Sequence, residues 1–428
     1  IFQKENGFRK FTLHCVIPMR TSSTAQLLLL VLFFYVSYII YRRSTTWLVQ
    51  SAEKRWVIHN GFCVRPYLHA GRDVTIRLLS SPSDPNDHLL TTMPRDDPRV
   101  FQDDLTLLAH SSASALDEKY LGKLLANWRG PISLAVSLQG SFNAHHVRKK
   151  IDATLRWLGN EEYAARFSVH VLFERFGELT CDESERRLDD ATPPPNTFFA
   201  EYPINTVRNV ARLFSTTRYI AFADSDYLFS VGFYKKILAI LRDYVPIAST
   251  TALLYRIFEV EEKDSRRRNN ELTKADLSEL ITKSKARVFH GKLWPQGHSV
   301  PNLTEWLDAP ESESPGLFDL TISLKNRPVW EFQFAGLRDV PLFDENFPYR
   351  VDNNLELRWE VCRAGYQLLP VEDLFVYHTL SRNKHDKDDA SRKYTIKQKN
   401  NPIAAKAKKA FKKRLNRLYP NTKADCSV

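Results

Sequence analysis

Two aspartates carry the clearest chemical signal in the sequence. Residues 219–229 read Tyr-Ile-Ala-Phe-Ala-Asp-Ser-Asp-Tyr-Leu-Phe, so Asp224 and Asp226 directly follow a run of residues with β-propensity. The pattern predicts a buried strand that ends at Ala223, with both carboxylates at its carboxyl end, where α/β sheets bind their ligands. Two carboxylates this close repel each other unless a cation lies opposite, and such hard oxygen ligands suit Mg²⁺ or Mn²⁺. We therefore expect a metal that carries a diphosphate.

Two other interpretations of the same triplet stay open at this point. An Asp-x-Asp triplet also occurs as a solvated turn or a helix cap. A strand followed by Asp-x-Asp is also typical of phosphatase-like sites, in which the first aspartate is a phosphoryl-accepting nucleophile. Those sites favour Thr or Val directly after the second aspartate, and Tyr227 fits that pattern poorly. The hydrophobic run before Asp224 favours a site over a solvated turn.

The strand needs a sheet around it, and the sequence supplies one. Residues 131–138 and 167–173 are apolar runs with strand character, and a helical pattern over residues 143–158 separates them. This alternation predicts β-α-β units and an α/β fold with a mostly parallel central sheet flanked by helices. After Pro203, Asn205 is expected to cap a helix through Phe214. Further helices are expected at 231–244 and 272–285, and residues 344–359 are expected to lead from a turn into a helix. Strands are expected at 247–258, 330–334 and 367–377, and a solvated loop at 261–270.

Composition excludes several classes of protein. With 428 residues, 43% of them apolar, the chain is long enough for one large domain with appendages. The formal charge of +11 is concentrated between Arg382 and Arg417, and aromatic residues do not alternate with the basic ones, so we expect no nucleic-acid partner. Phe411, Leu415 and Leu418 recur at helical spacing, which predicts an amphipathic helix within the basic tail at 396–428. Packing on the domain is the first expectation for this helix, and a membrane-surface contact is the alternative.

The N-terminal region has the pattern of a membrane anchor. Residues 25–41 are uncharged and predominantly apolar, and Arg42 follows them without a cleavage signal. At about 1.5 Å per residue the segment reaches about 25 Å, near the lower limit for a transmembrane helix. We expect a short cytosolic tail at 1–24, a signal anchor at 25–41, and a stem and domain edge at 42–127. Charges on both sides balance, so they do not set the orientation.

Cysteines and one sequon bear on the compartment. The five cysteines show no zinc-ligand spacing and no C-x-x-C pair, so neither a zinc module nor a redox motif is indicated. A lumenal domain would hold one disulfide, whose connectivity the sequence does not give. Asn302 begins the sequon Asn-Leu-Thr and is the predicted glycosylation site.

Five motifs follow one another along the chain. They are Trp128-x-Gly130-Pro131-Ile132-Ser133-Leu134-Ala135, Tyr202-Pro203-x-Asn205-x-x-Arg208-Asn209-Val210-Ala211, Asp224-x-Asp226, Trp294-x-x-Gly297-His298-x-x-x-Asn302-x-x-x-Trp306 and Phe343-Asp344-x-x-Phe347. Taken together and in this order, they resemble the motifs of family-49 glycosyltransferases. This family includes the glucuronyltransferase half of LARGE-type enzymes and a β-1,4-glucuronyltransferase that acts on dystroglycan glycans. The similarity covers about residues 128–395, the expected catalytic domain.

The resemblance implies a GT-A fold that holds a UDP-sugar donor through Mn²⁺, with Mg²⁺ as the alternative ion. It also implies an inverting transfer of a sugar, glucuronic acid being one candidate, to a glycan acceptor of a glycoprotein. The location it implies is the Golgi membrane, in single-pass type II topology with a lumenal catalytic domain. Asp226 matches the direct metal ligand, Asp224 a residue that reaches the metal through water or the donor ribose, and His378 the histidine that completes the metal site.

Further residues receive roles from the same resemblance. Arg208 and Asn209 match the donor-binding pair of the family. Trp294, His298 and Trp330 are candidates for contacts with the acceptor or the sugar, although large aromatic residues commonly belong to the core.

One segment departs from the family pattern. The family has Phe-x-Gly-aromatic-Gly-Trp-Asn-Lys where this chain reads Phe-Pro-Tyr-Arg-Val-Asp-Asn-Asn over residues 347–354, so both glycines are replaced by bulkier residues. In many inverting GT-A enzymes the general base lies on this segment, and Asp352 is the nearest carboxylate here and thus the candidate catalytic residue. Asn353 holds the family's asparagine position and is a candidate for contact with the acceptor or the sugar. The alternative function is therefore a catalytically inactive relative that binds glycans without turnover.

Overall fold

The computed structural model describes residues 57–59, 62–68, 102–138, 144–158, 166–174, 180–181, 183–184, 186, 202–224, 226–244, 250–292, 294–318, 322, 324, 329–380, 386–422, 426 and 428. The chain divides into two units, Ile1–Lys54 and Arg55–Val428, and every described residue belongs to the second. The expected anchor at 25–41 lies outside the described residues. Within the described part, no helix combines the length and the apolar character needed to cross a membrane.

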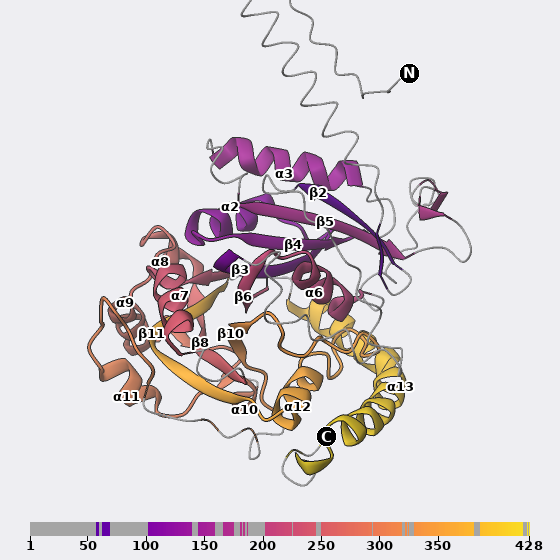
Figure 1. The fold of residues 1–428 in the computed structure, drawn as a ribbon. Helices are drawn as coiled ribbons and strands as arrows, with labels where there is room; N and C mark the ends of the chain where they lie inside the picture. Colours follow the sequence, from indigo (N-terminus) through magenta and orange to yellow (C-terminus); the bar gives the residue numbers. More distant parts are fainter. Residues whose placement is uncertain are drawn as a thin grey trace, which may run out of the picture. The chain divides into compact units, whose positions relative to one another are not determined.

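The described elements are shown in Figure 1. The strands are β1 (Val57–His59), β2 (Phe62–Leu68), β3 (Gln102–Ser112), β4 (Ile132–Ser137), β5 (Phe167–Glu174), β6 (Thr217–Phe222), β7 (Tyr227–Phe229), β8 (Thr251–Glu261), β9 (Ala286–Val288), β10 (Gln333–Leu337) and β11 (Gln367–Leu380). The helices are α2 (Glu118–Asn127), α3 (Ala144–Leu158), α6 (Ile204–Leu213), α7 (Phe233–Tyr244), α8 (Glu262–Arg266), α9 (Lys274–Thr282), α10 (Pro295–His298), α11 (Leu303–Asp308), α12 (Leu355–Arg363), α13 (Asp386–Leu418) and the 3₁₀ turn η2 (Pro420–Thr422).

The strands form one mixed sheet in the order β1-β2-β5-β4-β3-β6-β10-β8-β11-β7, with β9 paired to β8. Strands β5, β4, β3 and β6 run parallel, as expected for β-α-β units. Strand β10 then lies antiparallel between β6 and β8, and β7 is antiparallel to β11. The expectation of a mostly parallel sheet was therefore wrong, because β10 enters the sheet from a long excursion rather than from a helical crossover.

Helices cover both faces of the sheet, and the strand residues alternate between the two cores. Leu107 packs in one cluster with Trp128 and Phe233, on the face that α2, α3 and α7 cover. Its neighbour Leu108 packs in another cluster with Val207, on the face that α6 and α12 cover. This alternation follows from the period of two along a strand. The sheet is thus buried on both sides, and its strand ends carry the polar groups.

The sheet includes a strand from the region expected to be stem and domain edge. Strand β3 lies between β4 and β6 in the middle of the sheet, although its residues were assigned to the stem and domain edge at 42–127. The residues just before β3 are rich in Pro, Asp and Ser, a composition typical of loops and linkers, and this composition predicts a stem. The charged stretch at 261–270 also differs from expectation, because it contains the short helix α8, in which Asp264 and Ser265 are buried.

The C-terminal helix α13 packs on the domain, which confirms the first expectation for it. Phe411 and Leu415 are buried in a cluster with Phe347 and Trp359, so the apolar side of the helix faces α12. Two disulfides join distant parts of the fold where one was expected. They connect Cys63 to Cys181 and Cys362 to Cys426.

Candidate active site

The first polar pair of the site comes from parallel strand pairing. In the β3–β6 ladder, Leu108 pairs with Phe222. Two residues further along each chain, on the same face, stand His110 and Asp224. The Nε2 atom of His110 lies 3.0 Å from Oδ1 of Asp224. The other ring nitrogen of His110, Nδ1, lies 3.0 Å from the hydroxyl of Tyr202, so both sides of the imidazole are engaged.

The second polar pair comes from antiparallel pairing at the far edge of the sheet. His378 on β11 pairs with Tyr227 on β7, and Asp226 directly precedes Tyr227. The Nε2 atom of His378 therefore lies 3.0 Å from Oδ2 of Asp226. The strand continues for two residues beyond His378, so the histidine lies within β11 rather than at its end.

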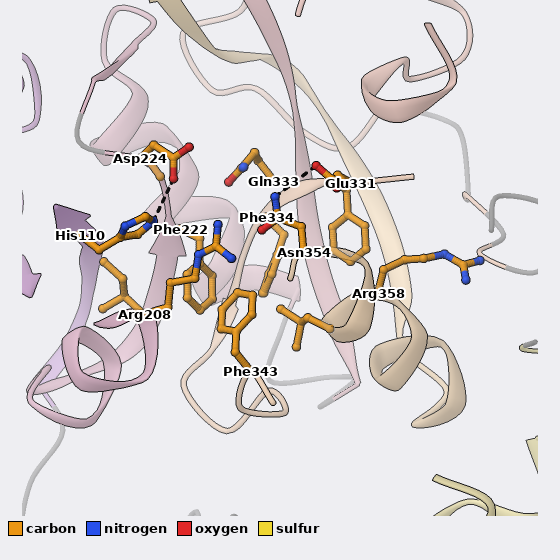
Figure 2. Close-up of a pocket in the computed structure, with 14 residues that line it drawn as sticks. His110, Arg208, Phe222, Asp224, Glu331, Gln333, Phe334, Phe343, Asn354 and Arg358 are labelled. Carbon is orange, nitrogen blue, oxygen red and sulfur yellow. Dashed lines mark hydrogen bonds and ion pairs between the residues drawn. The ribbon is translucent and has the colours of Figure 1, made fainter. Parts of the chain in front are cut away.

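Part of the site is a cavity lined from β3, α6, β6, β10 and α12 (Figure 2), and neither Asp226 nor His378 lines it. His110 and Asp224 stand on one side of it, and Glu331 with Asn354 stands on the other. Its floor is apolar, and the guanidinium of Arg208 reaches up from α6 between the two sides. The complete lining is Leu108, His110, Arg208, Phe222, Ala223, Asp224, Glu331, Phe332, Gln333, Phe334, Phe343, Asn354, Leu357 and Arg358.

Nearby charges shift the pKa of Asp224 and the pKa of His378 toward the charged form of each group. Burial alone would raise the pKa of Asp224, but the hydrogen bond from His110 and the charges of His110, Arg208 and His378 lower that pKa to about 2. Burial would lower the pKa of His378, but the hydrogen bond and charge of Asp226 outweigh it and raise that pKa. A divalent cation bound by Asp226 and His378 needs the neutral imidazole, so the cation and a proton would compete for His378.

A carboxylate oxygen and an imidazole nitrogen 3.0 Å apart form a donor set that suits Mn²⁺. Oδ1 of Asp224 faces His110. Within the described part of the chain, no cluster of three or more His, Cys, Asp or Glu side chains has the geometry to hold a metal. Asp226 and His378 thus fit a metal as two protein ligands, while the ligand role expected for Asp224 stays a prediction.

Helix α6 contributes Arg208 to the cavity and other polar side chains to its surroundings. It begins after Pro203, so Asn205 lies inside the helix rather than at its cap, and its amide donates to the carbonyl of Asp344. Arg208 donates to Asn205 Oδ1 and to the carbonyl of Asn353, and its guanidinium lies 4.9 Å from the centre of the Phe343 ring. These contacts fix Arg208 with its charge facing Asp224.

Two other polar residues of α6 serve the fold. The amide of Asn209 donates to the carbonyl of Phe343 and to Glu345, and its oxygen accepts from the backbone of Phe343. Asn209 does not line the cavity, so its contacts are those of a positioning residue, and its expected donor contact stays a prediction. Arg212 is buried and donates to the carbonyls of Val340 and Pro341.

The aromatic residues expected to contact sugars differ in their placement. His298 is buried, and its Nδ1 must carry the hydrogen because it faces the carbonyl of Glu331 at 2.9 Å. Burial lowers the pKa of His298 to about 4, so the ring is neutral. Trp294 is half-buried and packs over Gly297, where a Cβ would come within 2.5 Å of the indole. Trp330 is 1% exposed and packs in the core against Phe332, so its ring has no open face for a sugar.

The segment that departs from the family pattern is compact in the structure. Arg350 and Asp352 have φ of 68° and 56°, a left-handed conformation that side chains other than glycine rarely adopt. Tyr349 packs edge-on against Tyr202, with 5.4 Å between ring centres. The side chain of Asp352 lies 4.0 Å from Lys408 on α13 and does not line the cavity. Asn353 is buried and contributes its carbonyl to Arg208.

Sequence reasoning missed His110, Glu331 and Asn354. The signal for His110 was present, since it follows the apolar run of residues 105–109 just as Asp224 follows its own strand. Glu331 stands next to Trp330, and no spacing rule singles out Glu331 in the sequence.

Sequence comparison identifies the family. A profile described as "Glycosyl-transferase for dystroglycan", family 49, matches residues 104–420. This chain belongs to that glycosyltransferase family. Beta-1,4-glucuronyltransferase 1 of Danio rerio is 25% identical over 350 residues, which are 78% of this chain and 78% of the relative. The xylosyl- and glucuronyltransferase LARGE2s of Gallus gallus is 24% identical over 281 residues, which are 64% of this chain but 32% of the relative. The family expected from the motifs is thereby confirmed at low identity.

Similarity to solved structures is weak. The crystal structure of GalNAc-T7 with UDP, GalNAc and Mn²⁺ matches with a TM-score of 0.31 at 11% identity, covering 66% of this chain and 45% of that one. Staphylococcus aureus TarS 1–349 in complex with UDP-GlcNAc matches with a TM-score of 0.33 at 14% identity, covering 74% and 73%. TM-scores this low carry no argument about the site.

Proposed function

We propose that this family-49 glycosyltransferase has a GT-A fold and moves a sugar from a UDP-sugar to a glycan acceptor of a glycoprotein, with inversion, in the presence of Mn²⁺. The observation that carries the proposal is the 3.0 Å approach of Asp226 Oδ2 and His378 Nε2 at the carboxyl-end edge of the sheet. Names of the relatives make glucuronic acid the first donor sugar to test.

The residues of the site divide the work. Asp226 and His378 would hold the metal, which when bound supplies a Lewis acid for the diphosphate leaving group. His110, fixed by Tyr202, holds the carboxylate of Asp224 in place for the donor. Arg208, which is 8% exposed, brings a positive charge to the cavity that Asp224 and His110 line and is suited to negative charge that develops on the departing UDP. The apolar floor limits the water that reaches the reacting atoms.

The deciding experiment is release of UDP from a panel of UDP-sugars, with and without a panel of simple glycoside acceptors, using the full chain. We expect acceptor-dependent release that excess EDTA abolishes and Mn²⁺ restores better than Mg²⁺. Calorimetric titration of UDP in Mn²⁺ separates binding from turnover. Binding of UDP with no release from any donor would favour the glycan-binding alternative, for which the bulky Tyr349 beside Tyr202 is the supporting observation.

For location we propose the Golgi membrane, with the domain in the lumen and residues 25–41 as a type II anchor. Two disulfides in the described domain suit an oxidising compartment. Asn302, the first residue of the sequon, is exposed at the start of α11 and accessible to glycosylation. Protease treatment of sealed microsomes tests the topology, since digestion of the domain without detergent would contradict it.

A further inference from the structure

The cavity contains a second carboxylate that the roles above leave unused. Among the residues that line it, only Asp224 and Glu331 carry carboxylates. Glu331 stands on the side opposite Asp224, beyond Arg208 (Figure 2). A carboxylate across the cavity from the donor side is placed where an acceptor hydroxyl would approach.

The structure holds Glu331 firmly and leaves part of its carboxylate open. Its backbone N–H donates to the carbonyl of Gly297 at 2.7 Å, and its carbonyl accepts from His298. Asn354 donates its amide to Oε2 of Glu331 at 3.1 Å. From the described residues, no hydrogen bond reaches Oε1. Oε2 is thus fixed by the side chain of Asn354 at the N-terminus of α12, and Oε1 remains available to a ligand.

The charges around Glu331 suit a group that takes up a proton. Burial raises the pKa of Glu331, and the negative charges of Asp224 and Asp352 raise it further, while the Asn354 hydrogen bond and the charge of Arg208 lower it. The net shift is upward. His298 on α10 is neutral and faces the backbone of Glu331 rather than its carboxylate. Proton acceptors work best when their pKa is shifted toward the working pH.

Asp352, the carboxylate expected from the sequence to be the base, is placed less well. It lies outside the lining of the cavity, and its carboxylate faces Lys408 of α13. Of the two carboxylates, Glu331 is therefore the better placed to take a proton from an acceptor in the cavity.

We propose that Glu331 is the general base of the transfer, an assignment that rests on the proposed function. The acceptor hydroxyl gives its proton to Oε1 of Glu331 while its oxygen forms the bond to the anomeric carbon of the donor sugar. The bond between that carbon and the β-phosphate oxygen breaks, and its electron pair leaves with UDP. Asn354 is a positioning residue that keeps the carboxylate turned toward the acceptor.

The test compares three variants of the full chain. Glu331→Gln keeps the shape and the Asn354 contact but takes up no proton, so kcat should fall by about 100-fold or more. Binding of UDP in Mn²⁺ should stay at the wild-type level, and kcat/KM should lose the rise with pH that the wild type shows. Asp352→Asn should lower kcat less than Glu331→Gln does. Glu313→Gln, an exposed glutamate between α11 and β10, is the matched control and should leave kcat unchanged.

Several outcomes would overturn the assignment. A Glu331→Gln enzyme that keeps more than about a tenth of wild-type kcat, or the same rise with pH, has its base elsewhere. A larger loss in Asp352→Asn than in Glu331→Gln would return the role to Asp352. If the wild type released no UDP from any donor, the proposed function would fail together with this assignment. An active wild type with an active Glu331→Gln variant would remove the assignment alone.

Discussion

His110 and Asp224 lie as close together as His378 and Asp226, at 3.0 Å in each pair, yet their surroundings differ. The imidazole of His110 is engaged on both nitrogens and is 11% exposed. The imidazole of His378 is 29% exposed, and within the described part of the chain Asp226 is the one polar partner of its ring nitrogens. The first pair has the features of a support that sets the position of a carboxylate. The second pair offers two ligand atoms to an incoming cation.

Asp226→Asn should give the largest effect and tests the ligand role directly. The substitution removes a negative charge from the metal site with little change of shape, so kcat should fall by about 100-fold or more, at least about 3 kcal/mol of transition-state stabilisation. Rates measured over a Mn²⁺ titration check this. Asp243→Asn on the exposed face of α7 serves as control. Unchanged rate and Mn²⁺ dependence, or full activity in excess EDTA, would remove the metal site.

His378→Ala should have the next largest effect. One ligand is lost while the carboxylate of Asp226 remains, so the Mn²⁺ concentration for half-maximal rate should rise by about tenfold or more, together with a lower maximal rate. The measurement is the same Mn²⁺ titration at saturating donor. A half-maximal concentration equal to that of the wild type would place His378 outside the metal site.

His110→Ala separates the two pairs. Loss of the hydrogen bond to a charged carboxylate should raise the donor KM about tenfold, about 1.4 kcal/mol, while the half-maximal Mn²⁺ concentration stays unchanged. Donor titrations at fixed Mn²⁺ measure the donor KM. If His110→Ala instead shifted the Mn²⁺ dependence as His378→Ala does, the distinction between support and ligand would be wrong.

Asp224→Asn should produce the smallest effect, a lower free energy of unfolding measured without metal. The pKa of Asp224 in the folded protein, about 2, lies below that of an unfolded aspartate. The pair of His110 and Asp224 therefore stabilises the fold above about pH 4, and the stabilisation is lost as pH falls toward 2. Because 43% of the Asp224 side chain is exposed, solvent screening limits it to about 1 kcal/mol or less. Urea unfolding in EDTA should show a gap to wild type at pH 7 that closes in acid; a gap that widens in acid contradicts the pairing.

Sequence patterns located the Asp224 side of the cavity better than the Glu331 side. The strand before Asp224 could be predicted because a buried strand needs an apolar run, and β6 shows one. His110 was missed although β3 has the same pattern, because strand order is a property of long-range pairing that no local pattern contains. Glu331 was missed for a related reason, since its role depends on Asn354 and Asp224, which lie far from it in sequence.

The topology of the sheet, too, could be predicted only in part from the sequence. Individual strands β4, β5 and β11 were expected within a few residues of their observed bounds, because apolar runs and turn residues delimit them. The antiparallel entry of β10 was not expected, since strand direction depends on the path of the chain between elements. That path also carries Glu331 to the cavity, two residues before β10 begins.

The disulfide between Cys362 and Cys426 has a practical consequence for making the protein. It closes a covalent ring that contains all of α13 and is anchored at the last turn of α12, whose first turn carries the cavity residues. A crosslink across 64 residues stabilises a fold by about 4 kcal/mol in the chain-entropy description. Protein produced in a reducing bacterial cytosol lacks this ring, whereas secretion from a eukaryotic host supplies it. After a single cut in α13, the fragments separate on a denaturing gel only when reductant is present.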